Sequence, residues 1–176
     1  MRVVGGSAKG RRLRVPPIEG IRPTSDRVRE AVINALGSRD AVDGATVLDL
    51  YAGSGAMGIE ALSRGAAWAV FVEANRTARD TILTNLTRCG LEDRGEVVAD
   101  TVDGYLDRAI VDGQRFDVAI CDPPYAFDAW DGLLARLPAD LVVIESAHRV
   151  VAPPGWSLVR EASYGATWVG FVEPDS

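Results

Sequence analysis

The sequence is poor in the residues that support disulfide, metal or thiol chemistry. Its 176 residues include two cysteines, Cys89 and Cys121, and one histidine, His148. The cysteines form no CxxC pair, and with a single histidine they offer no credible zinc cluster or cysteine–histidine nucleophile pair. We therefore expect no metal, and two reduced cysteines that pack as small core residues.

The sequence also lacks a long hydrophobic run. No segment approaches the roughly 20 apolar residues that span a bilayer, and the stretch after Met1 is rich in glycine and arginine and has no apolar core segment. Hydrophobic residues nevertheless make up 47% of the chain, which is typical of a globular protein with a core of its own. We expect a soluble, cytoplasmic protein.

Positive charge is scarce over most of the chain and concentrated at its start. Residues 1–29 contain eight arginines and lysines and two acids, whereas the remainder has a net charge of −12. A local basic patch can bind phosphates that an acidic surface would repel, so the arm predicts a contact with nucleic acid. Charge alone fits a solvated or disordered arm equally well.

The pattern of apolar residues divides the chain into a short N-terminal hairpin and a main domain. Strand-like runs at 2–4 and 12–15, around a Gly/Ser/Lys turn, predict a small basic β-hairpin within residues 1–22, followed by a main domain over 23–176. Pro23 and Thr24 are the predicted start of a helix with one apolar face, from which Arg22, Arg27 and Arg29 can point away from the core.

From residue 46 onward the pattern alternates regularly between strands and helices. Strands are predicted at 46–51, 67–73, 95–100, 116–122 and 140–147, and helices at 56–65, 75–90, 102–109 and 128–137. This alternation, with several strands apolar throughout, indicates a doubly wound, Rossmann-like α/β fold with a mostly parallel sheet. The runs 156–163 and 166–173 predict an antiparallel hairpin at one sheet edge.

Ligands of open α/β sheets bind beyond the carboxyl ends of the strands, where this sequence places glycines and acids. The turn Gly53-x-Gly55-x-x-Gly58 also matches the dinucleotide fingerprint, which is weak evidence for a nicotinamide cofactor. Glu73 and Asp100 end the next two strands, where a carboxylate can accept hydrogen bonds from ribose or adenine. Each acid alone could equally cap a helix.

The stretch CDPPY, residues 121–125, ends another strand. Its two prolines lack backbone N–H groups and fix φ, so the loop leaves the sheet in a stiff, extended form. Asp122 and the Pro123 carbonyl can accept the hydrogens of a planar amine, and Tyr125 can stack on its ring. An ionised carboxylate can accept from the adjacent N1–H and N2–H of guanine, which modestly favours guanine over adenine.

These motifs resemble known ones. LDLYAGSGAMGIEALSRGA resembles the first motif of class I S-adenosylmethionine-dependent methyltransferases, and DPPY the fourth motif of enzymes that methylate exocyclic amines. With MRVVGGSAKGRRLRVP and RPTSDRVREAVINAL, nearly the whole chain resembles the RsmD family of bacterial 16S ribosomal RNA guanine-N2 methyltransferases. The resemblance implies methyl transfer from S-adenosylmethionine to guanine N2 of 16S ribosomal RNA, within small-subunit assemblies rather than naked RNA.

The resemblance also assigns residues. It implies that the glycine loop lies under the methionine part of the cofactor, with Glu73 at the ribose and Asp100 at the adenine amine. The predicted catalytic residues are Asp122, Pro123, Pro124 and Tyr125. The predicted cofactor residues are Thr24, Asp49, Ala52, Gly53, Gly55, Glu73, Ala74, Asp100, Thr101 and Asp122. The predicted RNA contacts, on the N-terminal hairpin acting as a lid and just after it, are Lys9, Arg11, Arg12, Arg14, Arg22 and Arg27.

Three alternatives remain open from the residues. A DNA adenine-N6 methyltransferase shares DPPY, but the chain has no room for a DNA-reading domain. A nicotinamide-dependent oxidoreductase fits the glycine turn but leaves the basic arm and DPPY unexplained. A catalytically silent RNA-binding module would not need Asp122 and Tyr125.

Overall fold

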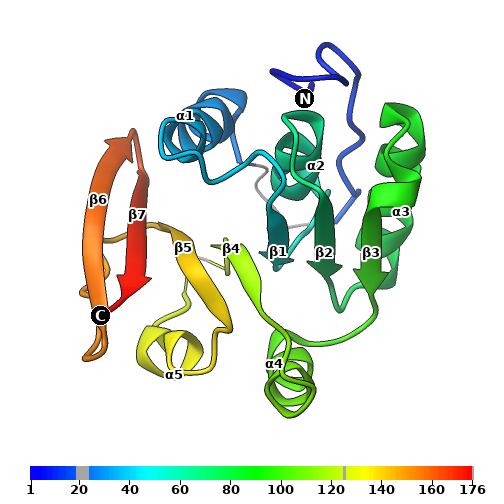
Figure 1. Cartoon of the computed structure of the whole chain (residues 1–176). Helices are drawn as coiled ribbons and strands as arrows, with labels where there is room; N and C mark the ends of the chain where they lie inside the picture. Colours follow the sequence, from blue (N-terminus) through cyan, green and yellow to red (C-terminus); the bar gives the residue numbers. More distant parts are fainter. Residues whose placement is uncertain (19–23, 125, 176) are drawn as a thin grey trace.

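The protein is built on one seven-stranded sheet. The computed structural model describes residues 1–18, 24–124 and 126–175, and its strands have the order β3-β2-β1-β4-β5-β7-β6 (Figure 1). The strands are β1 (Thr46–Leu50), β2 (Trp68–Val72), β3 (Gly95–Val98), β4 (Phe116–Cys121), β5 (Ala139–Ser146), β6 (Trp156–Tyr164) and β7 (Thr167–Pro174). The first five are parallel, and β7 is antiparallel to both β5 and β6. The predicted α/β fold and its edge hairpin are confirmed.

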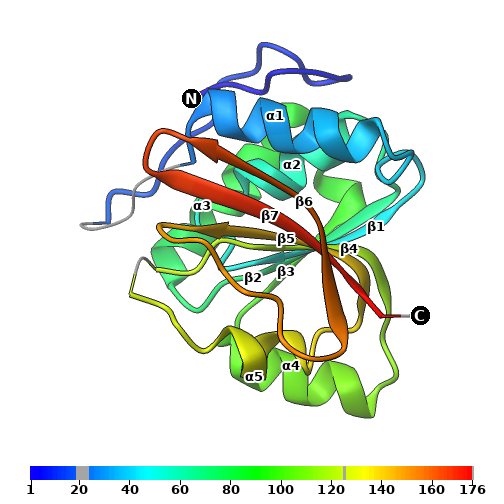
Figure 2. The ribbon, with the colours of Figure 1, turned by 90° about the vertical axis from the view of Figure 1, so that its left-hand side faces the viewer.

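Helices cover both faces of the sheet. They are α1 (Asp26–Gly37), α2 (Ala56–Ser63), α3 (Arg76–Cys89), the short 3-10 helix η1 (Glu92–Arg94), α4 (Val102–Val111) and α5 (Trp130–Leu134). Helices α1, α2 and α3 lie on one face, and α4 and α5 on the other (Figures 1 and 2). Alternate residues of β1 supply the two cores: Val47 packs with the first group of helices and Leu48 with the second. Among the described residues, no helix is both long and apolar enough to cross a membrane.

The sheet contains a switch in strand order between β1 and β4. The chain runs outward from β1 through β2 to β3, then returns to place β4 on the other side of β1. Loops that leave adjacent strands in opposite directions open a crevice at their carboxyl ends. Leu50 is paired in register with Cys121, so the glycine turn and the DPP loop begin side by side.

The predicted N-terminal hairpin is reduced to a single antiparallel bridge between Arg2 and Arg12. Val3 N donates to the Arg11 carbonyl at 3.0 Å, but the next residues turn toward α2 instead of extending the pairing. There Glu60 accepts hydrogen bonds from the backbone N–H groups of Val4 (2.9 Å) and Gly5 (2.8 Å), which removes those donors from any ladder. Figure 2 shows the segment lying over α1 and α2.

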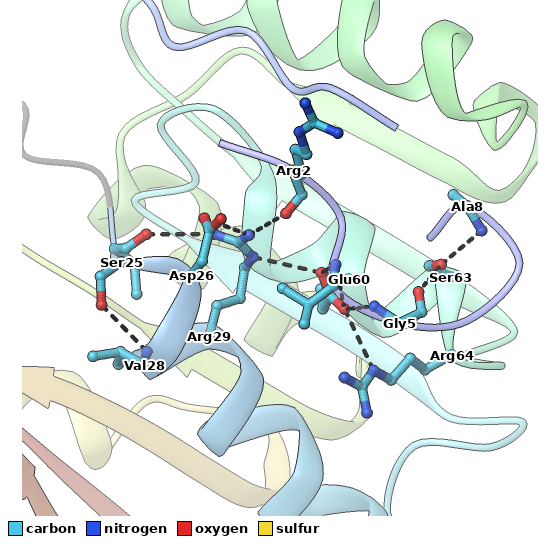
Figure 3. Close-up of polar contacts among 12 residues, drawn as sticks. Arg2, Gly5, Ala8, Ser25, Asp26, Val28, Arg29, Glu60, Ser63 and Arg64 are labelled. Atoms are coloured by element: carbon cyan, nitrogen blue, oxygen red, sulfur yellow. Dashed lines mark hydrogen bonds and ion pairs between the residues drawn. The ribbon is translucent and has the colours of Figure 1, made fainter. Parts of the chain in front are cut away.

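The start of α1 corrects two predictions. The N-cap is Ser25, whose hydroxyl accepts from Val28 N at 3.3 Å, and not Thr24. Arg29 does not point away from the core: it is fully buried, and its Nε lies 3.5 Å from Glu60 Oε2 (Figure 3). Arg27 is exposed as predicted, whereas Arg22 and Pro23 lie outside the described residues.

The cysteines are free thiols. Cys121 is fully buried at the end of β4, whereas Cys89 is only half-buried at the end of α3, so the prediction of a core residue holds for the first and not fully for the second. Burial raises the pKa of the Cys121 thiol, and nearby Asp49 and Asp122 raise it further. The thiol therefore stays neutral, as expected of a packing residue.

Candidate active site

A cavity of about 630 Å³ lies at the carboxyl ends of the parallel strands. Its size is within the range of small-molecule sites. Loops after β1, β2, β3, β4 and β5 line it, together with the residues before α1. It brings together most of the predicted site residues: Thr24, Asp49, Ala52, Gly53, Glu73, Ala74, Asp100, Thr101, Asp122, Pro123 and Pro124.

The glycine turn after β1 divides into a cavity wall and a packing contact. Gly53, at φ 55°, lines the cavity, and a Cβ there would meet only the Tyr51 carbonyl oxygen at 3.8 Å. Gly55 does not line the cavity; a Cβ on it would lie 3.0 Å from Ile82. Gly55 therefore serves the close approach of α2 and α3, while Gly53 leaves room for a ligand.

Asp49 is buried beneath this turn. Its Oδ2 accepts from Gly58 N at 2.9 Å, so it satisfies a free N–H in the first turn of α2. Burial raises the Asp49 pKa to about 8, with a smaller contribution from the nearby charges of Asp122 and Glu73. Asp49 thus both caps α2 from outside and adds a proton-holding group to the cavity floor.

Glu73 joins the second strand end to the glycine turn. Its Oε2 accepts from Gly53 N at 2.9 Å and its Oε1 from Asn75 N at 2.8 Å. The cap of α3 is Asn75, which accepts from Ala78 N, so the alternative that Glu73 is merely a helix cap does not apply. The carboxylate is held at the cavity wall by backbone N–H groups.

Asp100 occupies the equivalent place after β3. Its Oδ1 accepts from Thr101 N at 2.7 Å, and its other oxygen pairs with Arg108 of α4. Thr101, and not Asp100, caps α4 by accepting from Gly104 N at 3.1 Å. As with Glu73, another residue caps the following helix, and the acid itself lines the cavity.

The DPP loop presents Asp122 to the same cavity. Asp122 is half-buried and accepts a hydrogen bond from the Thr24 hydroxyl at 2.9 Å. Burial raises the Asp122 pKa to about 6, although the Thr24 bond acts in the opposite direction. Pro123 and Pro124 also line the cavity, and Tyr125 lies outside the described residues.

Two groups of cavity residues escaped the sequence analysis. Phe127 packs edge-on against Trp130, with ring centroids 4.9 Å apart, and tilted against Tyr51 at 6.0 Å. All three rings line the cavity beside the DPP loop, where a planar ligand would meet them. No spacing rule joins residues 51, 127 and 130, but aromatics flanking two strand-end motifs were a usable signal.

Glu145 is the second omission. It is 3% exposed, lies near the end of β5 and lines the cavity. Its Oε2 is 3.4 Å from the Thr24 hydroxyl, and its Oε1 has no hydrogen-bond partner among the described residues. Burial first, and then the charges of Asp122 and Asp49, raise the Glu145 pKa well above its usual range. An acid that ends an apolar strand was the signal already used for Glu73 and Asp100.

The cations predicted to contact RNA are on the surface. Lys9, Arg11, Arg12, Arg14 and Arg27 are exposed and form no ion pair with any described residue. Arg22 lies outside the described residues.

Asn85 of α3 connects the basic N-terminal segment to the glycine turn after β1. The buried Asn85 side chain accepts from Arg14 N at 2.8 Å and donates to the Arg14 carbonyl at 3.0 Å. The same amide donates to the Ser54 carbonyl at 2.9 Å. The backbone of the arm is therefore fixed beside the glycine turn, while the guanidinium of Arg14 is exposed.

The cavity acids were compared with the arrangement that a metal ion requires. Within residues 1–18, 24–124 and 126–175, no group of three or more histidine, cysteine, aspartate or glutamate side chains is placed to hold an ion. The acids of the cavity instead contact backbone N–H groups, a hydroxyl or an arginine.

The sheet order, the glycine turn and the DPP loop define a Rossmann-like class I methyltransferase. Residues 1–173 match the family described as "Conserved hypothetical protein 95", and the chain belongs to that family. The resemblance to RsmD proteins drawn from the sequence motifs is confirmed.

Individual relatives match over nearly the whole chain. "Ribosomal RNA small subunit methyltransferase D" of Escherichia coli K12 is 34% identical over 94% of this chain and 85% of its own. The protein of the same name from Haemophilus influenzae is 32% identical, over 94% of this chain and 89% of its own. A solved structure of a hypothetical protein of Thermus thermophilus superposes with a TM-score of 0.85 at 36% identity, covering 98% of this chain and 99% of the other.

Proposed function

We propose that this protein transfers a methyl group from S-adenosylmethionine to the exocyclic N2 of a guanine in 16S ribosomal RNA. The observation that carries the proposal is the meeting of the DPP carboxylate, Asp122, with the strand-end acids Glu73 and Asp100 around one cavity. The ribosomal RNA methyltransferases among its relatives support the reaction and the class of RNA.

The residues present fit an adenosine cofactor. The cavity of about 630 Å³ carries carboxylates at the ends of β2 and β3 that can accept from ribose hydroxyls and an adenine amine, and an open wall at Gly53. Asp49, Ala52, Ala74 and Thr101 complete this side of the cavity. When bound, S-adenosylmethionine supplies an electrophilic methyl group.

The chain's own contribution to the reaction is orientation of the amine. The N2 lone pair of guanine is delocalised into the ring, so the amine is a poor nucleophile until its hydrogens are held. Asp122, ionised above pH about 6, accepts one amine hydrogen, and the Pro123 carbonyl accepts the other. Tyr125 stacks on the base, a role that stays a prediction from the sequence.

The cations that contact RNA phosphates are Lys9, Arg11, Arg12, Arg14, Arg22 and Arg27. The backbone of Arg14, which Asn85 fixes beside the glycine turn, supports this, because phosphates held there position the target base at the cavity. We propose that the substrate is RNA already folded in a small ribosomal subunit or an assembly intermediate, and that the protein acts in the cytoplasm. Residues 1–22 form the RNA-gripping lid and residues 23–176 the methyltransferase domain.

The test is transfer of labelled methyl from S-adenosylmethionine to small subunits that lack the modification, alongside naked 16S RNA and DNA. N2-methylguanosine recovered from digested subunits supports the proposal. Label in N6-methyladenine of DNA would move the protein to the adenine-N6 class. Cofactor binding without transfer to any substrate would indicate a silent RNA-binding module.

A further inference from the structure

One hydroxyl group lies between the two carboxylates at the ends of β4 and β5. The Thr24 hydroxyl is 2.9 Å from Asp122 Oδ2 and 3.4 Å from Glu145 Oε2. The three residues come from distant parts of the chain and line the same cavity. Glu145 is 3% exposed, and its other oxygen, Oε1, has no partner among the described residues.

A threonine hydroxyl has a single hydrogen, so it cannot donate to both carboxylates at once. The shorter contact assigns that hydrogen to Asp122. The contact with Glu145 is then favourable only if Glu145 carries a proton and donates it to the Thr24 oxygen. Burial and the charges of Asp122 and Asp49 raise the Glu145 pKa and favour this protonated form, and Arg29 acts in the opposite direction. The result is a chain of bonds from Glu145 through Thr24 to Asp122.

The backbone of Thr24 is also held. Arg29 Nη1 donates to the Thr24 carbonyl at 3.4 Å, and Arg29 is itself fixed by Glu60, by Asp26 and by the Arg2 carbonyl (Figure 3). Thr24 is therefore anchored at its carbonyl by a buried arginine and at its hydroxyl by two acids. A rigid support of this kind fixes the orientation of the carboxylate it contacts.

We propose that Thr24 and Glu145 are positioning residues for methyl transfer, which hold Oδ2 of Asp122 and leave its Oδ1 for the amine of the target base. The inference rests on the proposed function, in which Asp122 accepts from that amine. It gives Thr24 a role other than the cofactor contact predicted from the sequence, and it gives Glu145 a role that the sequence did not predict.

Paired variants test the inference. Thr24→Val and Glu145→Ala each lower kcat for methyl transfer by roughly 10- to 100-fold, the usual cost of losing an outer partner of a reacting group, while the Kd for S-adenosylmethionine changes less than threefold. Thr24→Ser and Glu145→Gln, which keep a donor at each place, recover most of the lost kcat. Thr84→Val is the matched control, because Thr84 donates only to a carbonyl of its own helix.

The pH profile separates positioning from simple packing. The wild-type kcat falls as the pH rises through the raised pKa of Glu145, because Glu145 then loses the proton that it donates to Thr24. Glu145→Gln abolishes this fall because an amide does not titrate. The groups that act on Glu145 are Asp122, Asp49 and Arg29. A fall of kcat with rising pH that persists unchanged in Glu145→Gln would overturn the role of Glu145.

A measurement without substrate distinguishes failure of the proposed function from failure of this inference. In a carbon-13 carboxyl titration of the full chain, Thr24→Val raises the Asp122 pKa, because the lost hydrogen bond favoured the ionised form. If wild-type protein methylates no guanine but this shift appears, the proposed function fails and the contact stands. If kcat and the Asp122 pKa are both unchanged in Thr24→Val, or if cofactor affinity falls as much as kcat, the inference is wrong.

Discussion

Two carboxylates, the fully buried Glu60 and the half-buried Asp122, lie at opposite ends of one polar network and have opposite surroundings. Glu60 of α2 is fully buried and accepts from Val4 N and Gly5 N, with the guanidinium groups of Arg29 and Arg64 within 3.5 Å (Figure 3). Asp122 receives one hydroxyl hydrogen, and acids rather than cations lie around it.

The different surroundings of Glu60 and Asp122 indicate that the first stabilises the fold and the second serves the site. A buried charge that is paired and hydrogen-bonded holds its neighbours in place, and Glu60 in this way fixes the N-terminal segment to α1 and α2. Buried acids without a cation cost stability and persist only where they serve a task. Asp49, Asp122 and Glu145 form no ion pair with any described residue, and under the proposed function Asp122 receives the amine of the target base.

Breaking the compensated cluster has the largest expected effect. Arg29→Met removes a guanidinium that contacts Glu60, Asp26 and two backbone carbonyls, and leaves Glu60 buried with less compensation. We expect the free energy of unfolding to fall by about 3–5 kcal/mol, the usual cost of breaking a buried pair, in urea titrations. Arg27→Met, on the exposed side of the same helix, is the control and should change it by less than about 0.5 kcal/mol. A loss below about 1 kcal/mol for Arg29→Met would contradict the comparison.

Removing the exposed cations of the N-terminal segment should affect only RNA binding. The triple variant Arg11→Ala, Arg12→Ala and Arg14→Ala should reduce the slope of log affinity against log salt by roughly two to three units, one for each phosphate contact. Filter-binding measurements at several salt concentrations test this, with calorimetric titration of the cofactor as the control. An equal fall in cofactor affinity would show that these residues shape the cavity rather than bind RNA.

Removing the charge of Asp122, which has no cation in contact with it, should stabilise the protein. In the folded protein the Asp122 pKa is raised from 3.8 to about 6, so the folded state binds the proton more tightly than the unfolded chain does. The resulting destabilisation is absent below pH about 4, grows through pH 4–6 and is complete above that range. Asp122→Asn should therefore raise the free energy of unfolding at pH 8 by roughly 1–2 kcal/mol, after allowance for partial exposure, and leave it nearly unchanged at pH 3.5. The opposite trend would contradict the raised pKa.

The smallest expected effect is a difference in the number of protons released when each of two ligands binds. The sulfonium of S-adenosylmethionine is positive and the thioether of S-adenosylhomocysteine is neutral, so only the first lowers the pKa of nearby acids. At pH 7, with the Asp49 pKa about 8 and the Asp122 pKa about 6, the sulfonium form should release more protons on binding. Calorimetry in buffers of different ionisation enthalpy measures the difference, which should vanish at pH 10. Equal proton release from both ligands at pH 7 would place the sulfonium away from these acids.

The sequence predicted the sheet well because apolar runs and strand-end glycines are local signals. The runs that form β1 to β5 are mostly apolar, and Glu73, Asp100 and Asp122 could be predicted because each directly follows such a run. The rule that an acid at the end of an apolar strand marks the site also applies to Glu145, the seventh residue of β5.

What could not be predicted depends on partners far away in the chain. Arg29 lies at helical spacing from Val32, Ile33 and Leu36, which places it on the buried face, but only Glu60 explains why a cation is tolerated there. Thr24 was predicted to start the helix, although the cap is Ser25. The hydroxyl of Thr24 instead contacts Glu145, which is 121 residues away in the sequence. Contacts of this kind have no local pattern.

The central claim is that the cavity acids serve methyl transfer while Glu60 serves the fold, and one experiment compares them directly. Single-turnover methylation of small ribosomal subunits by Asp122→Ala and Glu60→Gln, corrected for the folded fraction of each variant, should give opposite results. The account predicts at least about a 100-fold loss of N2-methylguanosine formation for Asp122→Ala, which stays folded and binds cofactor, and near wild-type transfer per folded molecule for the less stable Glu60→Gln. Wild-type transfer by Asp122→Ala would contradict it.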